Sequence, residues 1–435
     1  MPARYRGAMS AHLGPERGLA AASSANGPNT PSTPRVEAVV VPAGPDGVPI
    51  VAERLRAALH TAATPIALIP DVGPSAPSAV VARIRQALQP GVPADHPEVA
   101  VVVATSGSTG QPRGVLHSAR SLEALTPAVH AYLTATPTWI AALPLTSMGG
   151  LNVLIRALAT DRLPIPLASL GGAAPFRVRD VTTAIEHSLA PIAISLVAAQ
   201  IARLLDEPEG ITALRACALI LVGGGPTPSA LNARAAEHGI TLTRTYGSTE
   251  TSGGCVFDGR PLPGVHIQAG RNAENPARIV IDGPMVALGY RCDPVASHQV
   301  FTADGLLTSD LGYVDAEGTL VVVGRSDDVV VIRGVNVSLP AVAQVADPGH
   351  PCVAVALPGP PGTEPRIVVC IAAGSGAQRV VDVEEVKRRV RAELGPPAVP
   401  TQVLVVEDLP MLGNGKPDRQ AIAAMARESL DTEGI

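Results

Sequence analysis

The chain has 435 residues, a formal net charge of −5 and a hydrophobic content of 46%. This length can fill one large and one small domain, whereas the acidic balance and the lack of a basic block argue against a nucleic-acid partner. No apolar run is long enough to cross a membrane, and five scattered cysteines without metal-ligand spacing favour a reducing, cytoplasmic location.

Residues 1–36 are rich in Ala, Ser, Pro and Gly and lack hydrophobic periodicity, which predicts a disordered tail. Short apolar runs then alternate with amphipathic stretches. Strands are expected at 37–41, 99–104, 139–143, 192–197, 218–222 and 278–281, and helices at 50–60, 78–88, 121–133, 150–159, 198–206 and 229–238. This alternation predicts an α/β fold in which helices cover a largely parallel sheet.

The pattern changes after Thr308. Strand-like runs at 318–323 and 329–332 flank a polar string at 324–328, and further strands are expected at 352–356 and 367–372. The stretch 383–394 places its apolar residues on one face, which predicts an amphipathic helix. We therefore expect a large domain over 37–326 and a small α+β domain over 327–435.

The run 105–114 follows the apolar strand expected at 99–104. Its first six residues all have small side chains: Thr105, Ser106, Gly107, Ser108, Thr109 and Gly110. Glycines let successive N–H groups converge, hydroxyls add donors and Arg113 adds a positive charge, so the run can form a nest for a polyphosphate. A flexible surface loop is the alternative for such a run alone.

Two further segments carry groups suited to a nucleotide. At 245–251, Tyr246 could stack on a purine, Thr249 could donate to a phosphate and Glu250 could hold Mg²⁺. A turn with a structural tyrosine is the alternative. Asp310 could accept hydrogen bonds from ribose hydroxyls, or it could cap a turn.

Lysine is rare in this chain and occurs only at Lys387 and Lys416. Lys416 stands in a glycine-flanked run at 412–419. A compact ammonium reaches a crowded carboxylate–phosphate junction better than a planar guanidinium does, which gives a reason for lysine here. Chance retention is the alternative.

In this order, these segments resemble the adenylate-forming superfamily of acyl-CoA synthetases, peptide-synthetase adenylation domains and luciferases. The resemblance covers roughly residues 99–420. It implies a two-step reaction: a carboxylate attacks the α-phosphate of ATP to give an acyl-adenylate and diphosphate, and a thiol such as that of CoA then displaces AMP.

The resemblance also implies a role for each matching residue. The run 105–110 and Arg113, which stands where most members have lysine, would hold the β- and γ-phosphates. The adenine would be bordered by Gly223, Gly224, Gly225, Tyr246 and Gly247. Asp310 and Arg325 would bind the ribose, while Thr249 and Glu250 would address the α-phosphate and Mg²⁺.

The remaining roles implied by the resemblance concern catalysis and domain motion. Lys416 would bridge the substrate carboxylate and the α-phosphate, and it would act with Glu250 and Arg325 as a catalytic residue. Asp327 would be the hinge of a mobile small domain, which would bring Gly334 towards the incoming CoA thiol.

Segments at 143–156, 195–200 and 252–259 resemble the actinobacterial branch of the 2-succinylbenzoate–CoA ligases of menaquinone biosynthesis. One departure is the sequence at 146–148, where those ligases often carry histidine. The expected acyl-site residues are Ser147, Gly150, Asn152, Ser195, Gln200, Gly253 and Gly254. Packing is an equal alternative for Ser195 and Gln200, and Arg156 could bind a carboxylate or lie on a helix surface.

The sequence therefore predicts an ATP- and Mg²⁺-dependent 2-succinylbenzoate–CoA ligase. One alternative is a stand-alone adenylation enzyme that loads an aryl or small acid onto a carrier protein. Another is a catalytically inactive nucleotide-binding regulator. The expected partners are the small-molecule acid, ATP and CoA, without a nucleic acid or a membrane, and a homo-oligomer is left open.

Overall fold

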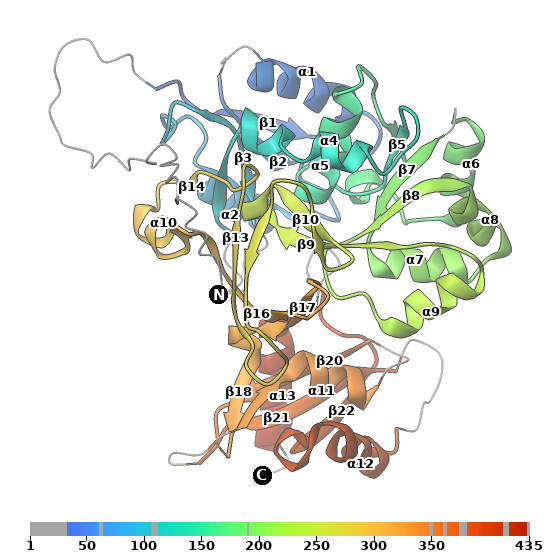
Figure 1. The fold of residues 1–435 in the computed structure, drawn as a ribbon, viewed down its shortest axis with the longest axis vertical. Helices are drawn as coiled ribbons and strands as arrows, with labels where there is room; N and C mark the ends of the chain where they lie inside the picture. The colour runs from blue at the N-terminus through green and yellow to red at the C-terminus, as the bar shows by residue number, and fades with distance from the viewer. Residues whose placement is uncertain are drawn as a thin grey trace, which may run out of the picture. The chain divides into compact units, whose positions relative to one another are not determined.

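The first sheet of the chain contains the strand that precedes the predicted phosphate run (Figure 1). The computed structural model describes residues 33–60, 64–105, 112–188, 191–333, 335–347, 351–359, 363–373, 381–411 and 417–432. In the first sheet, β1 (Glu37–Val41), β2 (Ile66–Pro70) and β3 (Val99–Ala104) run parallel. β4 (Gly114–Ser118) and β14 (Gly289–Tyr290) complete it in antiparallel pairs.

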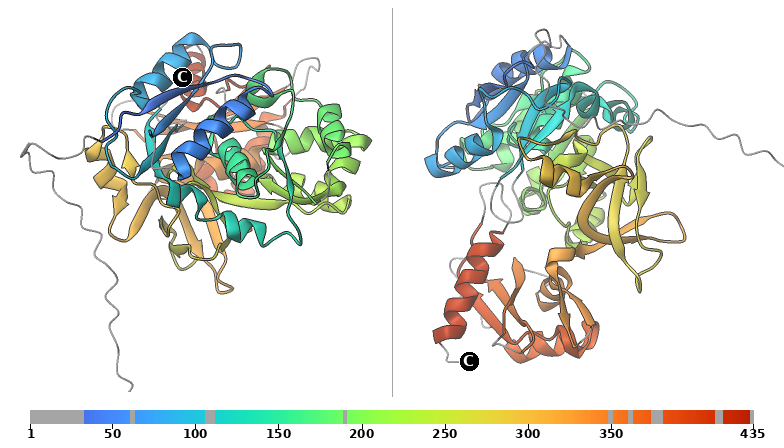
Figure 2. Two further views of the ribbon diagram at one scale, coloured as in Figure 1. Left: turned by 90° about the horizontal axis from the view of Figure 1, so that it is seen from above. Right: turned by 90° about the vertical axis from the view of Figure 1, so that its left-hand side faces the viewer.

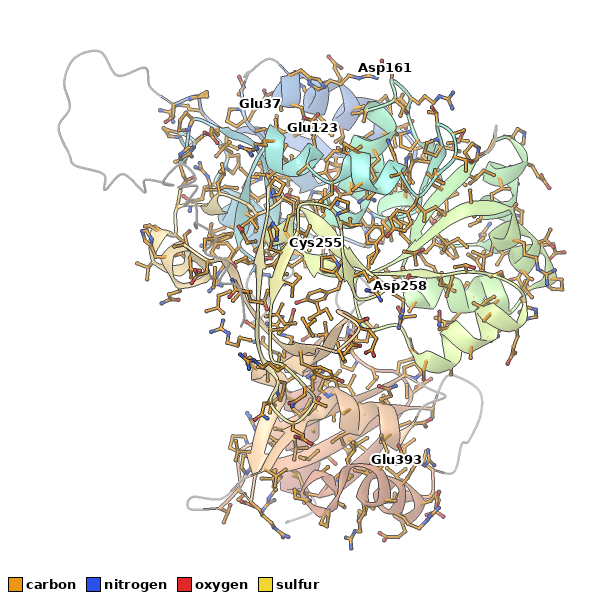
Figure 3. All side chains as sticks on the ribbon, viewed as in Figure 1. Glu37, Glu123, Asp161, Cys255, Asp258 and Glu393 are labelled. Atoms are coloured by element: carbon orange, nitrogen blue, oxygen red, sulfur yellow. The ribbon has the colours of Figure 1, made fainter. Side chains whose placement is uncertain are left out.

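The second sheet has the order β11–β10–β9–β8–β7–β5–β6. Its parallel strands are β5 (Thr138–Ala141), β6 (Ile165–Pro166), β7 (Ile192–Leu196), β8 (Cys217–Val222) and β9 (Thr243–Ser248). β10 (Gly253–Phe257) and β11 (Arg260–Pro261) are antiparallel. Cys255 of β10, labelled in Figure 3, is fully buried in the main core.

Helices cover both sheets as the predicted α/β fold requires. α6 (Val178–Glu186), α7 (Ala198–Leu205), α8 (Pro208–Ala216) and α9 (Ser229–Glu237) pack on one face of the second sheet. α2 (Ser78–Leu88) packs on the first sheet. α1 (Gly47–His60) and α5 (Met148–Leu158) share a core with residues of both sheets (Figures 1 and 2). This placement buries α5 on nearly all sides.

A third, antiparallel sheet was not predicted as a unit. It consists of β12 (His266–Gln268), β13 (Ala277–Asp282), β15 (Phe301–Thr302), β16 (Gly305–Val314) and β17 (Leu320–Arg325). α10 (Pro294–Val300) precedes β15. Asp310, for which a turn was one alternative, therefore lies inside a strand.

The C-terminal elements form an α+β unit. β18 (Val329–Ile332) and β19 (Val335–Ser338) pair as a hairpin. β20 (Cys352–Leu357), β21 (Arg366–Ala372) and β22 (Gln402–Val406) form a sheet. α11 (Leu339–Ala346) and α12 (Val383–Leu394) pack on one face of this sheet, and α13 (Arg419–Thr432) packs on the other (Figure 2). Within the described ranges, no apolar cluster joins residues up to Leu320 to residues from Val330 onward.

Most apolar elements lie where the sequence predicts them. The strands Glu37–Val41, Val99–Ala104 and Val329–Ile332 and the helices Ser78–Leu88 and Val383–Leu394 have the predicted bounds. The single helix expected at 121–133 is wrong, because α3 (Ala119–Glu123) and α4 (Thr126–His130) replace it. Pro127 stands in the first turn of α4 and has no N–H to continue α3.

The prediction that the tail includes Arg35 and Val36 is wrong, because both residues contact the fold. Val36 is 1% exposed, its N–H donates to the Val92 carbonyl, and its own carbonyl accepts from the Gly91 N–H. Arg35 also donates to the Gly91 carbonyl. These contacts bind residues 35 and 36 to the fold, whereas residues 1–32 lie outside the described ranges. No helix in the described residues is long and apolar enough to span a membrane.

Candidate active site

Three predicted nucleotide residues meet across β9, β16 and β17, and we call them the Asp310 cluster: Tyr246, Asp310 and Arg325. The Tyr246 hydroxyl donates to Asp310 Oδ2 at 2.7 Å. Asp310 pairs directly with Arg325 across the two strands, and Arg325 Nη1 lies 3.7 Å from Asp310 Oδ1. Burial and the Asp310 carboxylate raise the pKa of Tyr246, so its phenol stays protonated and donates.

The neighbouring Thr308 fixes the backbone of Asp310. Thr308 Oγ1 accepts from the Asp310 N–H at 3.1 Å and donates to the Ile279 carbonyl at 2.9 Å. The pairing of β13 with β16 shifts register between Arg278 and Val280. The side chain of Asp310 is 21% exposed, so the cluster presents a positioned carboxylate that ligand hydroxyls can reach.

A second group, which we call the Glu250 cluster, consists of Arg113, Glu250 and Tyr290. The Tyr290 hydroxyl donates to Glu250 Oε1 at 2.9 Å, and Arg113 Cζ lies 5.2 Å from the centroid of the Tyr290 ring. Burial and the Glu250 carboxylate raise the pKa of Tyr290. The sequence reasoning missed Tyr290; its signal was weak, being one of five tyrosines in the chain.

The surroundings of the Glu250 cluster suit a phosphate and its cation. A cavity of about 540 Å³ adjoins it, lined in part by Arg113, Tyr290 and Asp293. The described residues contain no group of three or more His, Cys, Asp or Glu side chains that could cage a metal. A single carboxylate such as Glu250 fits Mg²⁺, which proteins hold by one or two carboxylates together with substrate phosphates.

The two ends of the predicted phosphate run lie side by side. The Thr105 N–H donates to the Arg113 carbonyl at 2.8 Å, and Thr105 Oγ1 accepts from the Arg113 N–H at 3.1 Å. Two hydrogen bonds therefore hold Thr105 and Arg113, the described ends of the run, against each other. Several predicted site residues lie outside the described residues: Ser106, Gly107, Ser108, Thr109, Gly110, Gly334 and Lys416.

The glycines predicted to border the adenine follow β8 and lie in β9, and a close neighbour requires glycine at only some of them. Gly223 follows β8, and a Cβ there would lie 2.6 Å from Thr245 Oγ1. Gly224 has a φ of +85°, and Gly225 has open space around its α-carbon. Gly247 pairs with Gly254 across β9 and β10. Thr249 and Glu250 follow β9 in a short 3₁₀ helix, Thr249–Thr251, so the segment 245–251 is a strand that ends in a turn.

Ser147, Gly150 and Asn152 occupy the first turns of α5. Ser147 caps this helix, because its Oγ accepts from the Gly150 N–H at 3.3 Å. A Cβ at Gly150 would lie 2.2 Å from the Pro144 carbonyl, so only glycine fits. Asn152 Nδ2 donates to the Ser252 carbonyl at 2.8 Å, and a Cβ at Gly253 would lie 2.2 Å from the same nitrogen. Asn152 and Gly253 are therefore neighbours, as the acyl-site expectation requires.

Ser195 and Gln200, for which packing was the alternative to acid binding, both contact neighbouring parts of the fold. Ser195 is 7% exposed inside β7, opposite Leu221 of β8. Gln200 Oε1 accepts from the Val197 N–H at 3.0 Å, and Gln200 Nε2 donates to the Ala142 carbonyl at 3.4 Å. The amide of Gln200 thus caps α7 and ties it to the residue that follows β5.

Arg156 lies on α5 but not on its surface. The residue is 6% exposed, and its Cζ lies 5.5 Å from the centroid of the Trp139 ring. Burial lowers the pKa of the guanidinium to about 10. Within the described ranges, no carboxylate forms an ion pair with it. The helix-surface alternative for Arg156 is wrong, and the chain holds a buried cation one helical turn beyond Asn152.

Two family comparisons cover this architecture. Residues 35–291 match the family described as "AMP-binding enzyme", and residues 334–416 match "AMP-binding enzyme C-terminal domain". The first match spans more than half of the chain. The chain belongs to the AMP-binding enzyme family. This membership confirms the predicted superfamily and the predicted α/β fold with a smaller C-terminal unit.

Relatives of this AMP-binding enzyme include a probable 2-succinylbenzoate–CoA ligase of Mycobacterium tuberculosis, 37% identical over 331 residues, which cover 75% of this chain and 84% of that protein. A 2-succinylbenzoate–CoA ligase of Geobacillus kaustophilus is 29% identical over 342 residues, covering 73% of this chain and 67% of that protein. The o-succinylbenzoate CoA synthetase of Bacillus subtilis, solved with its acyl-adenylate intermediate, shares the fold at a TM-score of 0.70 and 21% identity, with 90% and 88% of the two chains covered.

Proposed function

We propose that this AMP-binding enzyme is an acid–CoA ligase that converts 2-succinylbenzoate, ATP and CoA to 2-succinylbenzoyl-CoA, AMP and diphosphate. The acyl-adenylate is the intermediate. The relatives that carry this activity in their names support the reaction class. The observation that carries the choice of acid is the buried Arg156, since 2-succinylbenzoate keeps one carboxylate when the other is activated.

Arg156 has the physical properties of a carboxylate-binding residue. Removing a lone cation from water costs several kcal/mol, and its contact with the Trp139 ring offsets about 0.5–2 kcal/mol. An anionic ligand group would supply the missing partner. Because Asn152 and Arg156 are four residues apart on α5, their side chains project from the same face of the helix. We assign Arg156 to the unreacted carboxylate.

In this proposal the Asp310 cluster and the Glu250 cluster bind different parts of ATP. Asp310 accepts the ribose hydroxyls, Arg325 stays beside it, and Tyr246 and the glycines at 223–225 border the base. Thr249 donates to the α-phosphate and Glu250 holds Mg²⁺, with Arg113 beside the outer phosphates. An oxygen of the acid attacks the α-phosphorus, and the bond from that phosphorus to the diphosphate breaks. The CoA thiolate next attacks the acyl carbon, and AMP leaves.

We assign the bridging of the acid and the α-phosphate to Lys416, and the described residues on either side of it contact each other. Met411 and Pro417 form an isolated bridge, and the Asp418 N–H donates to the Pro410 carbonyl at 2.8 Å. Arg419, the first residue of α13, forms an ion pair with Asp328. This pair ties the lysine loop to the segment in which we place the hinge.

The hinge assignment concerns the 3₁₀ helix Ser326–Asp328, which contains Asp327. The segregation of apolar clusters on its two sides supports a large domain over 37–326 and a small domain over 327–435. We also infer a reducing compartment, because all five cysteines are free thiols.

A substrate comparison tests the proposal. ATP–diphosphate exchange is measured with 2-succinylbenzoate and with 3-benzoylpropionate, which has the same keto-acid arm but no ring carboxylate. The proposal predicts exchange with both acids and a KM at least tenfold lower for 2-succinylbenzoate, since a buried charged partner contributes about 1.5–3 kcal/mol. Equal KM values would contradict the role of Arg156, and a thioester formed only on a carrier protein would contradict the CoA ligase.

A further inference from the structure

Ser252 occupies a junction between the nucleotide and acid sides of the site. It stands two residues after Glu250 and directly before Gly253. Its carbonyl accepts from Asn152 Nδ2 at 2.8 Å. Its hydroxyl donates to the Met285 carbonyl at 2.8 Å and lies 3.1 Å from His117 Nδ1. We call His117, Asn152, Ser252 and Gly253 the Ser252 cluster.

These hydrogen bonds determine the tautomer of His117. A hydroxyl has one proton, and the Met285 carbonyl can only accept it. The Ser252 oxygen must then accept from His117, so Nδ1 carries the imidazole proton. Burial lowers the pKa of His117 to about 3, and the ring is neutral at physiological pH. Its Nε2 is buried and has no partner among the described residues.

The backbone of Ser252 needs this support. Its φ is +51°, in the left-handed region that residues with a side chain seldom adopt. Gly253 follows with a φ of +99° and is pressed against the Asn152 amide. The position of Ser252 therefore sets the spacing of Asn152 and Gly253, which we assign to the acid.

The Ser252 N–H donates to the Thr249 carbonyl at 3.0 Å, but the Glu250 side chain and carbonyl have contacts of their own. The Glu250 carbonyl accepts from the Ala287 N–H at 2.9 Å, and the Glu250 carboxylate accepts from Tyr290. Neither contact involves His117 or Ser252. A change at His117 therefore acts on the acid wall before it acts on the metal-binding carboxylate.

We propose that His117 is a positioning residue for the acid: its Nδ1–H holds Ser252 in place, and Ser252 in turn holds the wall formed by Asn152 and Gly253. This inference rests on the proposed function of the site. It assigns a substrate-specific role to a residue of β4, a strand that otherwise leads out of the phosphate run.

Three substitutions separate this role from simple packing. Asn places its amide near the position of Nδ1 and can donate to Ser252, whereas Gln places its amide near Nε2. His117→Asn is expected to keep the KM for 2-succinylbenzoate within about threefold of the wild type. His117→Gln and His117→Leu are expected to raise it about tenfold, as for the loss of one buried hydrogen bond, with the KM for ATP changed less than threefold.

Ser252→Gly provides a second arm in case a His117 variant does not fold. Glycine accepts the positive φ but lacks the hydroxyl, so it should raise the KM for the acid as His117→Leu does. The double variant should be no worse than either single variant. Ser121→Ala is the matched control, because it removes a buried hydroxyl whose hydrogen bonds among the described residues are with the backbone of Ser118, at the end of the same strand.

Any one of three results overturns the inference. The KM values for the acid and for ATP rise equally, or His117→Asn is as impaired as His117→Leu. The third is that the effects of the His117 and Ser252 substitutions add in the double variant. The dissociation constant of the acid, measured calorimetrically in the presence of AMP, must follow the same order. If the wild type neither binds nor converts 2-succinylbenzoate, the proposed function fails instead. In that case a panel of carboxylic acids is tested for ATP–diphosphate exchange. The KM values of the same variants are then compared for the acid that supports exchange.

Discussion

The nucleotide side and the acid side of this site are built differently. The Asp310 and Glu250 clusters consist of charged and phenolic groups, and the side chains of Asp310 and Arg325 are 21% and 39% exposed. The acid side is buried: His117 is 0%, Asn152 6% and Arg156 6% exposed. An open, charged site suits ATP, which any adenylating enzyme must bind. A closed site with few polar groups suits the choice of one acid, because each unpaired group there has a high energetic cost.

The largest expected effect concerns the step that both sides share. Lys416→Ala should lower the rate of adenylation about 100-fold or more for every acid, because it removes the charge proposed to stabilise the transition state. Thioester formation from supplied acyl-adenylate should remain within a few-fold of the wild type. ATP–diphosphate exchange and thioester release measure the two half-reactions.

Lys387 is the matched control for this substitution, since it is the other lysine and pairs with Glu384 on the surface of α12. Lys387→Ala should change neither half-reaction. Equal losses in both half-reactions of Lys416→Ala would contradict the assigned role.

The next effect should be confined to the acid side. Arg156→Ala should raise the KM for 2-succinylbenzoate about 10- to 100-fold and leave the KM for 3-benzoylpropionate nearly unchanged. Arg203→Ala, at an arginine that donates to the Phe176 carbonyl, controls for the loss of a helix arginine. A similar rise for both acids would show that Arg156 supports the fold and does not bind the second carboxylate.

A smaller effect should be confined to the nucleotide side. Tyr290→Phe keeps the ring beside Arg113 but removes the hydrogen bond to Glu250. The Mg²⁺ concentration for half-maximal exchange should rise about 3- to 10-fold, as for the loss of one typical hydrogen bond, because the lost bond positions Glu250 and does not itself contact the ion. The apparent affinity for Mg²⁺–ATP, measured by calorimetry, should weaken in parallel. Tyr132→Phe, at an exposed tyrosine, is the control and should behave as the wild type. A rise in the KM for the acid alone in Tyr290→Phe would contradict the separation of the nucleotide side from the acid side.

The smallest effect concerns stability and pH. The pKa of His117 is about 3 in the folded chain, against an ordinary value of 6.5 for histidine. Between pH 3 and pH 6.5 the unfolded chain binds more protons at His117 than the folded chain does. The contribution of His117 to the free energy of unfolding is therefore present above pH 6.5 and decreases as the pH falls. From pH 7.5 to pH 6 the wild type should lose about 0.8 kcal/mol of unfolding free energy that His117→Asn does not lose. Urea unfolding at the two pH values measures this difference, and equal losses would place the ring in contact with water.

Short sequence motifs point to the proposed nucleotide residues more directly than to the contacts of the acid side, for a physical reason. The residues proposed for the phosphates lie in short runs, 105–110 and 245–251, in which neighbouring residues act together. The contacts of the acid side join distant positions: His117 and Ser252 are 135 residues apart. Strands were expected near β13 and β17 of the antiparallel sheet, but β16, which carries Asp310, was missed, because polar residues interrupt its apolar pattern and most of it is only half-buried.

The sequence around Arg156 contains a signal that could have predicted its burial. The residues around it on α5, from Leu151 to Leu158, are buried on every side. A helix that is apolar all round is buried in a core, so a single arginine within it is a buried cation. The environment of the arginine, more than the residue itself, predicts a ligand contact.

The most direct measurement follows product formation by mass spectrometry with ATP, Mg²⁺, CoA and 2-succinylbenzoate. Our account predicts equal amounts of AMP and 2-succinylbenzoyl-CoA, with no AMP when the acid is omitted. ADP in place of AMP, or AMP without a thioester of this acid, would contradict it.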